Sequence, residues 1–308
     1  MTYRATNRRR TPRAIMVVAI LAALALLTAA CGNGDTGTTG AADGDGPSVN
    51  IGWIPWDEDV AVTHLWKYLL EEEGYQVSLT QLDVAPVYQG LADGDVDVFL
   101  DGWLPATHAD YWERFGDELE DVGVWYDSGT LNLAVPANLD DIQTIGDLQG
   151  KADMFEGRIV GIEPGAGLMR VTREEAVPTY GLEDYEVLEG STPAMLAELE
   201  RALDRDEPIV VTLWHPHWAY ASYDIKDLED PEGAMGDAEN LHVLGRPGFS
   251  DDFPELAGWL ANFELPDDAL ASLEQLVINE YSQGEEQQAV EEWLSDPDNR
   301  ALADGWMS

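Results

Sequence analysis

Three segments of the chain each place a tryptophan directly after a predicted strand, beside a proline or an acidic residue. Ligands of open α/β sheets bind beyond the carboxyl ends of the strands, so these indoles stand where a ligand would lie. A single tryptophan is more often a core residue, but three in this setting favour a binding role. The segments are Trp53-Ile54-Pro55-Trp56-Asp57-Glu58, Asp101-Gly102-Trp103-Leu104-Pro105-Ala106-Thr107-His108 and Thr212-Leu213-Trp214-His215-Pro216-His217-Trp218.

The chemistry that grouped indoles support is the binding of a cation that cannot donate a hydrogen bond. The negative faces of aromatic rings attract such a cation, and each contact contributes roughly 0.5–2 kcal/mol. An aromatic cage for a trimethylammonium group is therefore the functional interpretation of these segments.

A candidate anion site accompanies the cage. The run Gly165-Ala166-Gly167-Leu168-Met169 follows a predicted strand and opens a helix, where backbone N–H groups are free to bind an anion. An ordinary tight turn between strand and helix explains the same residues. His108 lies five residues after Trp103 and is placed to donate to the same anion, although a lone histidine near a helix start is more often structural.

Catalytic patterns are absent from the sequence. There is no Gly-x-Ser-x-Gly, Gly150-Lys151 is not followed by Ser or Thr, and Arg170 stands where a dinucleotide fingerprint needs its third glycine. His215 and His217 have no partner cluster at metal-ligand spacing. We therefore predict no enzyme activity, no metal and no cofactor. The alternative from another class is a secreted hydrolase on the same scaffold, and its candidate acids are Asp57, Glu58, Asp59 and Asp101.

Strands and helices alternate from Ser48 onward, which predicts an α/β fold with mostly parallel sheets. The apolar runs 131–135 and 242–244 are predicted crossovers between two lobes, with a ligand cleft between them. Lobe I comprises residues 48–134 and 246–308, and lobe II comprises 135–245. The predicted strands are 49–53, 76–82, 96–100, 158–162 and 208–213. The predicted helices are 59–73, 108–119, 167–175, one capped by Thr192, and 254–261, 267–280 and 285–294.

The first residues are predicted to be a secretory signal peptide, residues 1–30. Five arginines precede an apolar run from Ala14 to Ala30, which ends in small residues. A transmembrane anchor is the alternative, and the run is at the short limit for one. Cys31, the single cysteine, is a candidate for lipidation, and residues 31–47 are a predicted flexible tether rich in Gly, Asp and Thr.

The charge of the chain is extreme, with 16 basic and 60 acidic residues and a net charge of −44. Such a charge excludes nucleic acid as a partner. Because the acidic residues are scattered, a solvated acidic surface is the interpretation that we favour for them.

Four motifs in order resemble the glycine betaine-binding proteins of osmoprotectant ABC importers, over nearly all of residues 48–308. One departure from the family pattern is His215, whose position is usually small or polar. The motifs are Trp56-Asp57, Trp103-Leu104-Pro105-x-Thr107-His108, Gly161-Ile162-x-Pro164-Gly165-x-Gly167 and Trp214-x-Pro216-His217-Trp218.

This resemblance implies a two-lobed periplasmic-binding-protein-like fold of type II, with two hinge crossovers. It assigns Trp56, Trp103 and Trp214 to the ammonium cage, and His108 with the amides of Gly167 and Leu168 to the carboxylate. His215 and His217 are then residues that surround the cage.

The implied function is that of a monomeric, lipid-anchored binding protein on the outer face of the cytoplasmic membrane. It delivers glycine betaine to a permease with a separate ATPase. Choline, carnitine, proline betaine and dimethylsulfonio compounds are the alternative ligands. A sensor module is a further alternative.

Overall fold

The computed structural model describes residues 46–308. The predicted signal peptide, the lipidation of Cys31 and nearly all of the predicted tether lie outside the described residues. Within residues 46–308, no helix is both long enough and apolar enough to cross a membrane.

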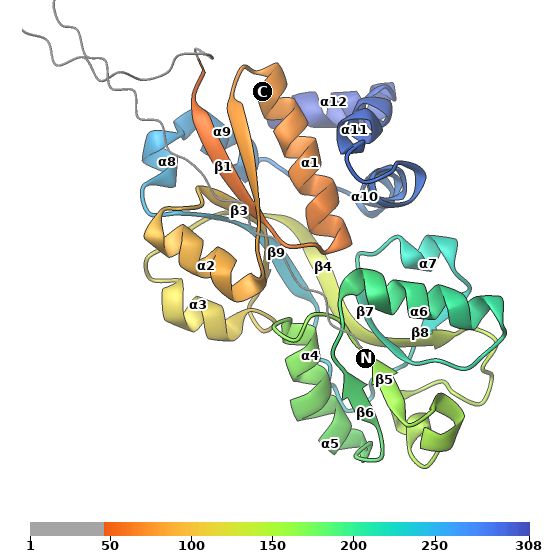
Figure 1. The fold of residues 1–308 in the computed structure, drawn as a ribbon. Coiled ribbons are helices and arrows are strands. Elements are labelled where there is room, and N and C mark those ends of the chain that lie inside the picture. The colour runs from red at the N-terminus through yellow and green to blue at the C-terminus, as the bar shows by residue number, and fades with distance from the viewer. Residues whose placement is uncertain (1–45) are drawn as a thin grey trace, which may run out of the picture. The chain divides into compact units, whose positions relative to one another are not determined.

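The strands of this part of the chain form one sheet in the order β2-β1-β3-β9-β4-β7-β5-β6, with β8 paired beside β4. Figure 1 shows helices on the faces of this sheet, which is the α/β arrangement that the alternating pattern predicts. The strands are β1 (Ser48–Trp53), β2 (Gln76–Gln81), β3 (Val98–Leu104), β4 (Glu120–Pro136), β5 (Arg158–Val160), β6 (Glu186–Leu188), β7 (Val211–His215), β8 (Ile225–Asp227) and β9 (Glu239–Gly245).

Two strands at the centre, the long β4 and the shorter β9, connect the two halves of the sheet. β4 pairs with β9 up to Gly129 and with β7 from Thr130 onward. We call the elements around β1–β3 the β1 half and those around β5–β8 the β7 half. Strand pairs are parallel in the outer parts and antiparallel at the centre. The prediction of mostly parallel sheets is wrong at the centre, because one connecting strand leaves the β1 half and the other returns to it.

Helices α1–α3 and α8–α12 belong to the β1 half, and α4–α7 belong to the β7 half (Figure 1). A π-helical stretch, 172–176, continues α4 into α5, and another, 275–280, continues α10. Short 3₁₀ turns lie at 145–148 and 152–155. The helices are α1 (Asp57–Glu72), α2 (Val84–Asp93), α3 (Ala109–Phe115), α4 (Gly167–Val171), α5 (Val177–Tyr180), α6 (Thr192–Asp204), α7 (Ala219–Ser222), α8 (Phe249–Asp252), α9 (Pro254–Ala261), α10 (Asp267–Glu274), α11 (Glu286–Leu294) and α12 (Pro297–Trp306).

Helix α1 shows how the apolar periodicity of the sequence becomes packing. Val62, Leu65, Trp66 and Leu69 recur at helical spacing, and at most 1% of each is exposed. The ring of Trp66 stacks on that of Trp306 of α12, with centroids 6.0 Å apart. The C-terminal helices therefore return to cover the first helix, as the sequence predicts for the segments after residue 254.

The start of α6 differs by one residue from the prediction. The cap is Ser191, whose hydroxyl oxygen accepts a hydrogen bond from the N–H of Ala194 at 3.4 Å. Thr192 is instead the first helical residue, and its N–H and hydroxyl both donate to the carboxylate of Glu163. The prediction that Thr192 is the cap is wrong because a distant carboxylate binds both of its donors.

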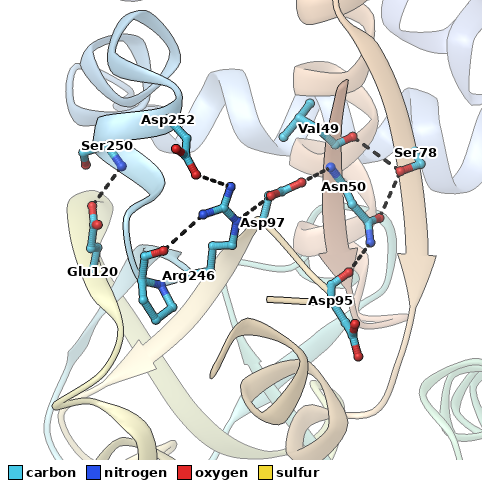
Figure 2. Close-up of polar contacts among 10 residues, drawn as sticks. Val49, Asn50, Ser78, Asp95, Asp97, Glu120, Arg246, Ser250 and Asp252 are labelled. Carbon is cyan, nitrogen blue, oxygen red and sulfur yellow. Dashed lines mark hydrogen bonds and ion pairs between the residues drawn. The ribbon is translucent and has the colours of Figure 1, made fainter. Parts of the chain in front are cut away.

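A single arginine and its acidic partners connect three strands of the β1 half. Figure 2 shows the guanidinium of Arg246 between Asp97 and Asp252. Arg246 Nε donates to Asp97 Oδ1 at 2.7 Å, and the N–H of Asn50 donates to Asp97 Oδ2, also at 2.7 Å. This carboxylate thereby ties β1 to the segment between α2 and β3 and to the chain that follows β9.

Replacement of Asp97 by alanine is expected to lower the free energy of unfolding by about 2 kcal/mol, because it leaves two half-buried donors without an acceptor. Asp252 is the matched control: it contacts the same guanidinium at 2.7 Å, but its side chain is 58% exposed. Asp252→Ala should cost less than about 1 kcal/mol. Urea unfolding of both variants measures the difference, and equal losses would contradict the role of Asp97.

Candidate functional site

A small cavity lies between the two halves. Aromatic and aliphatic side chains make most of its wall, and Glu58 contributes the one carboxylate that lines it within the described chain. The lining residues are Trp56, Glu58, Trp103, Thr107 and Leu131 on one side, and Ile162, Ala166, Gly167, Leu168 and Trp214 on the other.

The cage tryptophans reach the cavity from three different elements. Trp56 is the cap of α1 and follows β1, Trp103 lies within β3, and Trp214 lies within β7. The ring centroids of Trp56 and Trp214 are 6.5 Å apart. Gly129 of β4 leaves room for the ring of Trp103, because a Cβ there would come within 2.7 Å of it. The structure thus brings together at one cavity the three indoles predicted for the cage.

Two of these indoles donate their N–H groups to carboxylates of the opposite half. Trp214 Nε1 donates to Glu58 Oε2 at 2.9 Å, across 156 residues of sequence. Trp56 Nε1 donates to Glu163 Oε2 at 3.4 Å, across 107 residues. Each bond fixes the orientation of a ring and also joins the halves, so the shape of the cage depends on their approach.

The indoles of Trp103 and Trp218 also donate to carboxylates, that of Trp103 within its own strand and that of Trp218 across the two halves. Trp103 Nε1 donates to Asp101 Oδ1 at 3.0 Å, and Trp218 Nε1 donates to Asp57 Oδ2. Asp101 is fully buried in a strand that is otherwise apolar and glycine. Carboxylates around the cage add negative charge behind rings whose faces are already attractive to cations.

Burial raises the pKa of five carboxyl groups near the cage. It raises the pKa of Asp57 to about 6 and that of Asp59 to about 7. For Glu58, Asp101 and Glu274, loss of hydration raises the pKa well above its usual range, and neighbouring carboxylates raise it further. Raised pKa values of this kind indicate that these buried carboxyl groups have no compensating positive charge.

His108 is fully buried behind the cage, with its ring centroid 5.7 Å from that of Trp56. Its Nδ1 accepts the N–H of Trp103 at 3.1 Å, so the proton of the neutral ring is on Nε2. Burial lowers the pKa of His108 to about 3, which keeps the ring neutral. Within residues 46–308, Nε2 has no hydrogen-bond partner. It is a free donor beside the cavity, although His108 does not itself line the wall.

The turn before α4 brings backbone donors to the other end of the cavity. Gly167 and Leu168 are its first helical residues, so their N–H groups have no acceptor within the helix. Gly167 touches the opposite half, because a Cβ on it would lie 2.2 Å from the carbonyl oxygen of Thr107. Thr107 is held in turn by Glu239, which accepts from its hydroxyl at 2.5 Å.

The two other predicted histidines differ in their positions. His217 packs its ring edge-on against Trp214, with centroids 4.6 Å apart, and burial lowers its pKa to about 3. The neutral ring lies 3.4 Å from Asp57 without forming an ion pair. The ring of His215 lies apart from the cavity wall: it stacks on Tyr220 at 3.8 Å and contacts Asp227 at 2.8 Å.

The sequence interpretation missed the role of the acids. It considered Glu58 and Asp101 only as candidates for hydrolysis, and it did not single out Glu163. One signal was available, since Asp101 interrupts a strand that is otherwise apolar and glycine. A charged residue in a buried strand is rarely there without a partner or a function.

The arrangement suits binding better than catalysis. The cavity offers π faces, one carboxylate, a neutral histidine donor and free amides, which complement a small molecule with a cationic and an anionic end. In the part of the chain that the structure describes, no group of three or more His, Cys, Asp or Glu residues is suited to a metal ion. Two α/β halves that are joined by two strands and enclose such a cavity define a two-lobed solute-binding protein.

A comparison with known protein families identifies the kind of solute-binding protein. Residues 47–296 match the family described as the substrate binding domain of ABC-type glycine betaine transport system. The chain belongs to this family.

Two individual relatives match parts of the chain. The glycine betaine/carnitine transport binding protein GbuC of Listeria monocytogenes is 35% identical over 164 residues, and this match spans 51% of the chain and about half, 53%, of that relative. An uncharacterized protein, ORF1, of Chromohalobacter salexigens is 35% identical over 123 residues, which cover 38% of the chain and 78% of that protein.

Solved structures show the same fold. The glycine betaine/L-proline-binding protein ProX of Borrelia burgdorferi has a TM-score of 0.77 at 32% identity, over 85% of this chain and 97% of that one. Lactococcal OpuAC, closed on glycine betaine, has a TM-score of 0.78 at 29% identity, over 85% and 100%. A choline binding protein in complex with choline has a TM-score of 0.76 at 25% identity, over 84% and 91%.

Proposed function

We propose that this protein captures glycine betaine in the cavity and delivers it to the permease of an ABC importer. The observation that carries the proposal is the meeting of three indoles from three elements around one small cavity. A trimethylammonium group has no hydrogen to donate, so π faces are the surface that best replaces its hydration.

The two ends of the ligand use different parts of the cavity. The ammonium lies among Trp56, Trp103 and Trp214, where the carboxylate of Glu58 adds charge complementarity. The ligand carboxylate accepts hydrogen bonds from Nε2 of His108 and from the amides of Gly167 and Leu168. A neutral histidine that must donate through Nε2 suits this role, because its Nδ1 already accepts from the backbone of Trp103.

Binding proceeds by closure of the two lobes, which we take as residues 48–134 with 246–308, and residues 135–245. The ligand first meets the indoles of lobe I together with His108. Lobe II then adds Trp214 and the turn at Gly167, and water is expelled. Loss of water strengthens each electrostatic contact with the cation.

Ligand identity is tested by titration of the intrinsic tryptophan fluorescence with glycine betaine, choline, carnitine, proline betaine and a dimethylsulfonio compound. Three indoles at the site make this signal sensitive to occupancy. Glycine betaine should bind more tightly than choline, which has no carboxylate for His108, and than carnitine, whose carboxylate lies further from its cation. No response to any of these ligands would contradict the proposal.

Replacement of His108 by alanine separates the two ends of the ligand. A hydrogen bond to a charged group contributes about 1.5–3 kcal/mol, so the Kd for glycine betaine should rise about 10–100-fold. Choline has no carboxylate and serves as the matched control, with a much smaller change expected. Calorimetric titration measures both constants, and equal losses would argue against the carboxylate role of His108.

The cellular setting follows from the same proposal. We expect an extracytoplasmic monomer, directed by the signal in residues 1–30 and anchored by a lipid on Cys31, that works with a permease and a separate ATPase subunit. It has no catalytic activity of its own. GbuC and OpuAC, which carry transport-binding names, support this setting.

A further inference from the structure

We propose that the carboxyl groups behind the cage exchange a proton for the positive charge of the ligand, so that binding of the cation releases protons to solvent. The inference rests on the proposed function and concerns the acid cluster of Asp57, Glu58, Asp59, Asp101 and Glu274, which we call the cage acids. Asp59 and Glu274 accept no hydrogen bond from a cage indole, and an apolar residue in their place would avoid the cost of burying a charge.

The cage acids are unusually buried for residues that can carry a charge. All five are between 0% and 6% exposed, and three follow one another at the start of α1. Asp101 is on the neighbouring β3, and Glu274 lies at the end of α10. Within residues 46–308, no lysine or arginine forms an ion pair or hydrogen bond with any of them. Buried carboxylates are normally paired with a cation, and these are not.

Hydrogen bonds satisfy only some of the carboxyl oxygens of the cage acids. Asp59 accepts from the backbone of Ile54 at 2.7 Å and from the hydroxyl of Thr63 at 3.1 Å. In contrast, Glu58 Oε1 and Asp101 Oδ2 are buried with no hydrogen-bond partner in the described part of the chain. Glu58 lines the cavity itself, so a cation there lies against an acid that otherwise has no counter-charge.

Other titratable groups around the cluster do not supply the missing charge. His108 and His217 face it from the starts of α3 and α7, and burial lowers the pKa of each to about 3, so both stay neutral. Tyr88 of α2 has a raised pKa and keeps its proton. Glu163, on the β7 half, adds a further negative charge, since it raises the pKa of Asp57.

When no cation is bound, a proton therefore neutralises part of the negative charge of the cage acids. Burial raises the pKa values of the cage acids, so at least one of them holds a proton near neutral pH. A cation in the cage favours the ionised form and lowers these pKa values. The step is an exchange in which a carboxyl O–H bond breaks, its proton passes to water, and the carboxylate faces the ammonium. Because protons compete with the ligand, the affinity falls as the pH falls.

Calorimetric titration with choline in two buffers of different ionisation enthalpy tests the exchange on the complete chain. Choline has no group that titrates in this range, so any proton released comes from the protein. The apparent binding heat should differ between the buffers by an amount that corresponds to proton release. The Kd should rise by up to about tenfold per pH unit as the pH falls below the value of about 7 for Asp59.

Glutamine and asparagine variants locate the source of the proton. Glu58→Gln and Asp101→Asn keep an acceptor for the indole N–H, and at least one of them should reduce proton release by half or more. Glu163→Gln is the matched control. Glu163 also accepts from a cage indole, and the N–H and hydroxyl of Thr192 donate to the same carboxylate. This variant should weaken binding and lower proton release by clearly less than half, because Glu163 acts on the cluster only through Asp57.

The outcomes separate this inference from the proposed function. Equal binding heats in the two buffers, with a Kd independent of pH, overturn the exchange but leave capture of the ligand intact. Proton release that persists at full size in both Glu58→Gln and Asp101→Asn also overturns it. Failure of choline and glycine betaine to bind at all contradicts the proposed function itself.

Discussion

Replacement of Trp214 by alanine is expected to abolish measurable binding of glycine betaine, with a rise in Kd of more than about 100-fold. The change removes one wall of the cage and the only indole of the three that comes from the β7 half. It also leaves Glu58 Oε2 without the N–H that it accepts at 2.9 Å. Because Glu58 is fully buried, the lost bond adds to the loss of the π face.

Two further variants show whether the effect arises at the cage. Trp214→Phe keeps a π face but lacks the N–H, and an intermediate rise of about tenfold is expected. Trp259, on α9, is half-buried against Tyr75 with centroids 6.2 Å apart, and it lies outside the cavity wall. Trp259→Ala should leave the Kd unchanged. An unchanged Kd in Trp214→Ala, measured by calorimetry on folded protein, would remove the cage from the mechanism.

The aromatic part of the site was predictable because it depends on local pattern. Trp56 and Trp214 each lie at the end of a short apolar run, and the carboxyl ends of such strands meet at the same edge. The same argument placed Gly167 at a helix start. These features depend on residues that lie within about ten positions of one another in the chain. A single sequence is therefore enough to predict them.

The acid cluster was not predictable in the same way. With 60 acidic residues in the chain, nothing in the local sequence distinguishes Glu58 from the acids of a solvated helix face. Its partner Trp214 is 156 residues away, and the pairing exists only when both halves meet. Glu163 and Trp56 are separated in the same manner. Long-range pairs of this kind depend on the tertiary structure, which local periodicity does not encode.

The central strands are also longer than the sequence pattern predicts. β4 extends from Glu120 to Pro136, whereas the apolar run suggested only 131–135. Its first part contains charged residues and glycines, and its register against β9 shifts three times, so the alternation of apolar and polar residues is lost. The prediction of two crossovers was sound because the apolar end of β4 and the core of β9 keep their pattern.

Replacement of Gly167 by alanine is expected to raise the Kd for glycine betaine by more than about 100-fold, because it blocks closure of the lobes. An added Cβ would lie 2.2 Å from the carbonyl oxygen of Thr107 and 2.6 Å from its methyl group, far inside contact distance. The carbonyl cannot turn aside easily, since Glu239 binds both the N–H and the hydroxyl of Thr107. The halves must therefore stay apart at the place where we propose that the ligand carboxylate binds.

The matched control is two residues earlier in the same turn. A Cβ on Gly165 would approach only Val84, at an ordinary 3.7 Å, so Gly165→Ala should bind glycine betaine nearly as well as the original protein. Small-angle scattering with saturating ligand should detect compaction in Gly165→Ala and none in Gly167→Ala. Since α4 begins at Gly167 and tolerates alanine by propensity, a fold-wide loss of stability is not expected. Tight binding in Gly167→Ala would show that the amides at this turn hold the ligand without contact between the halves, and closure would then need another cause.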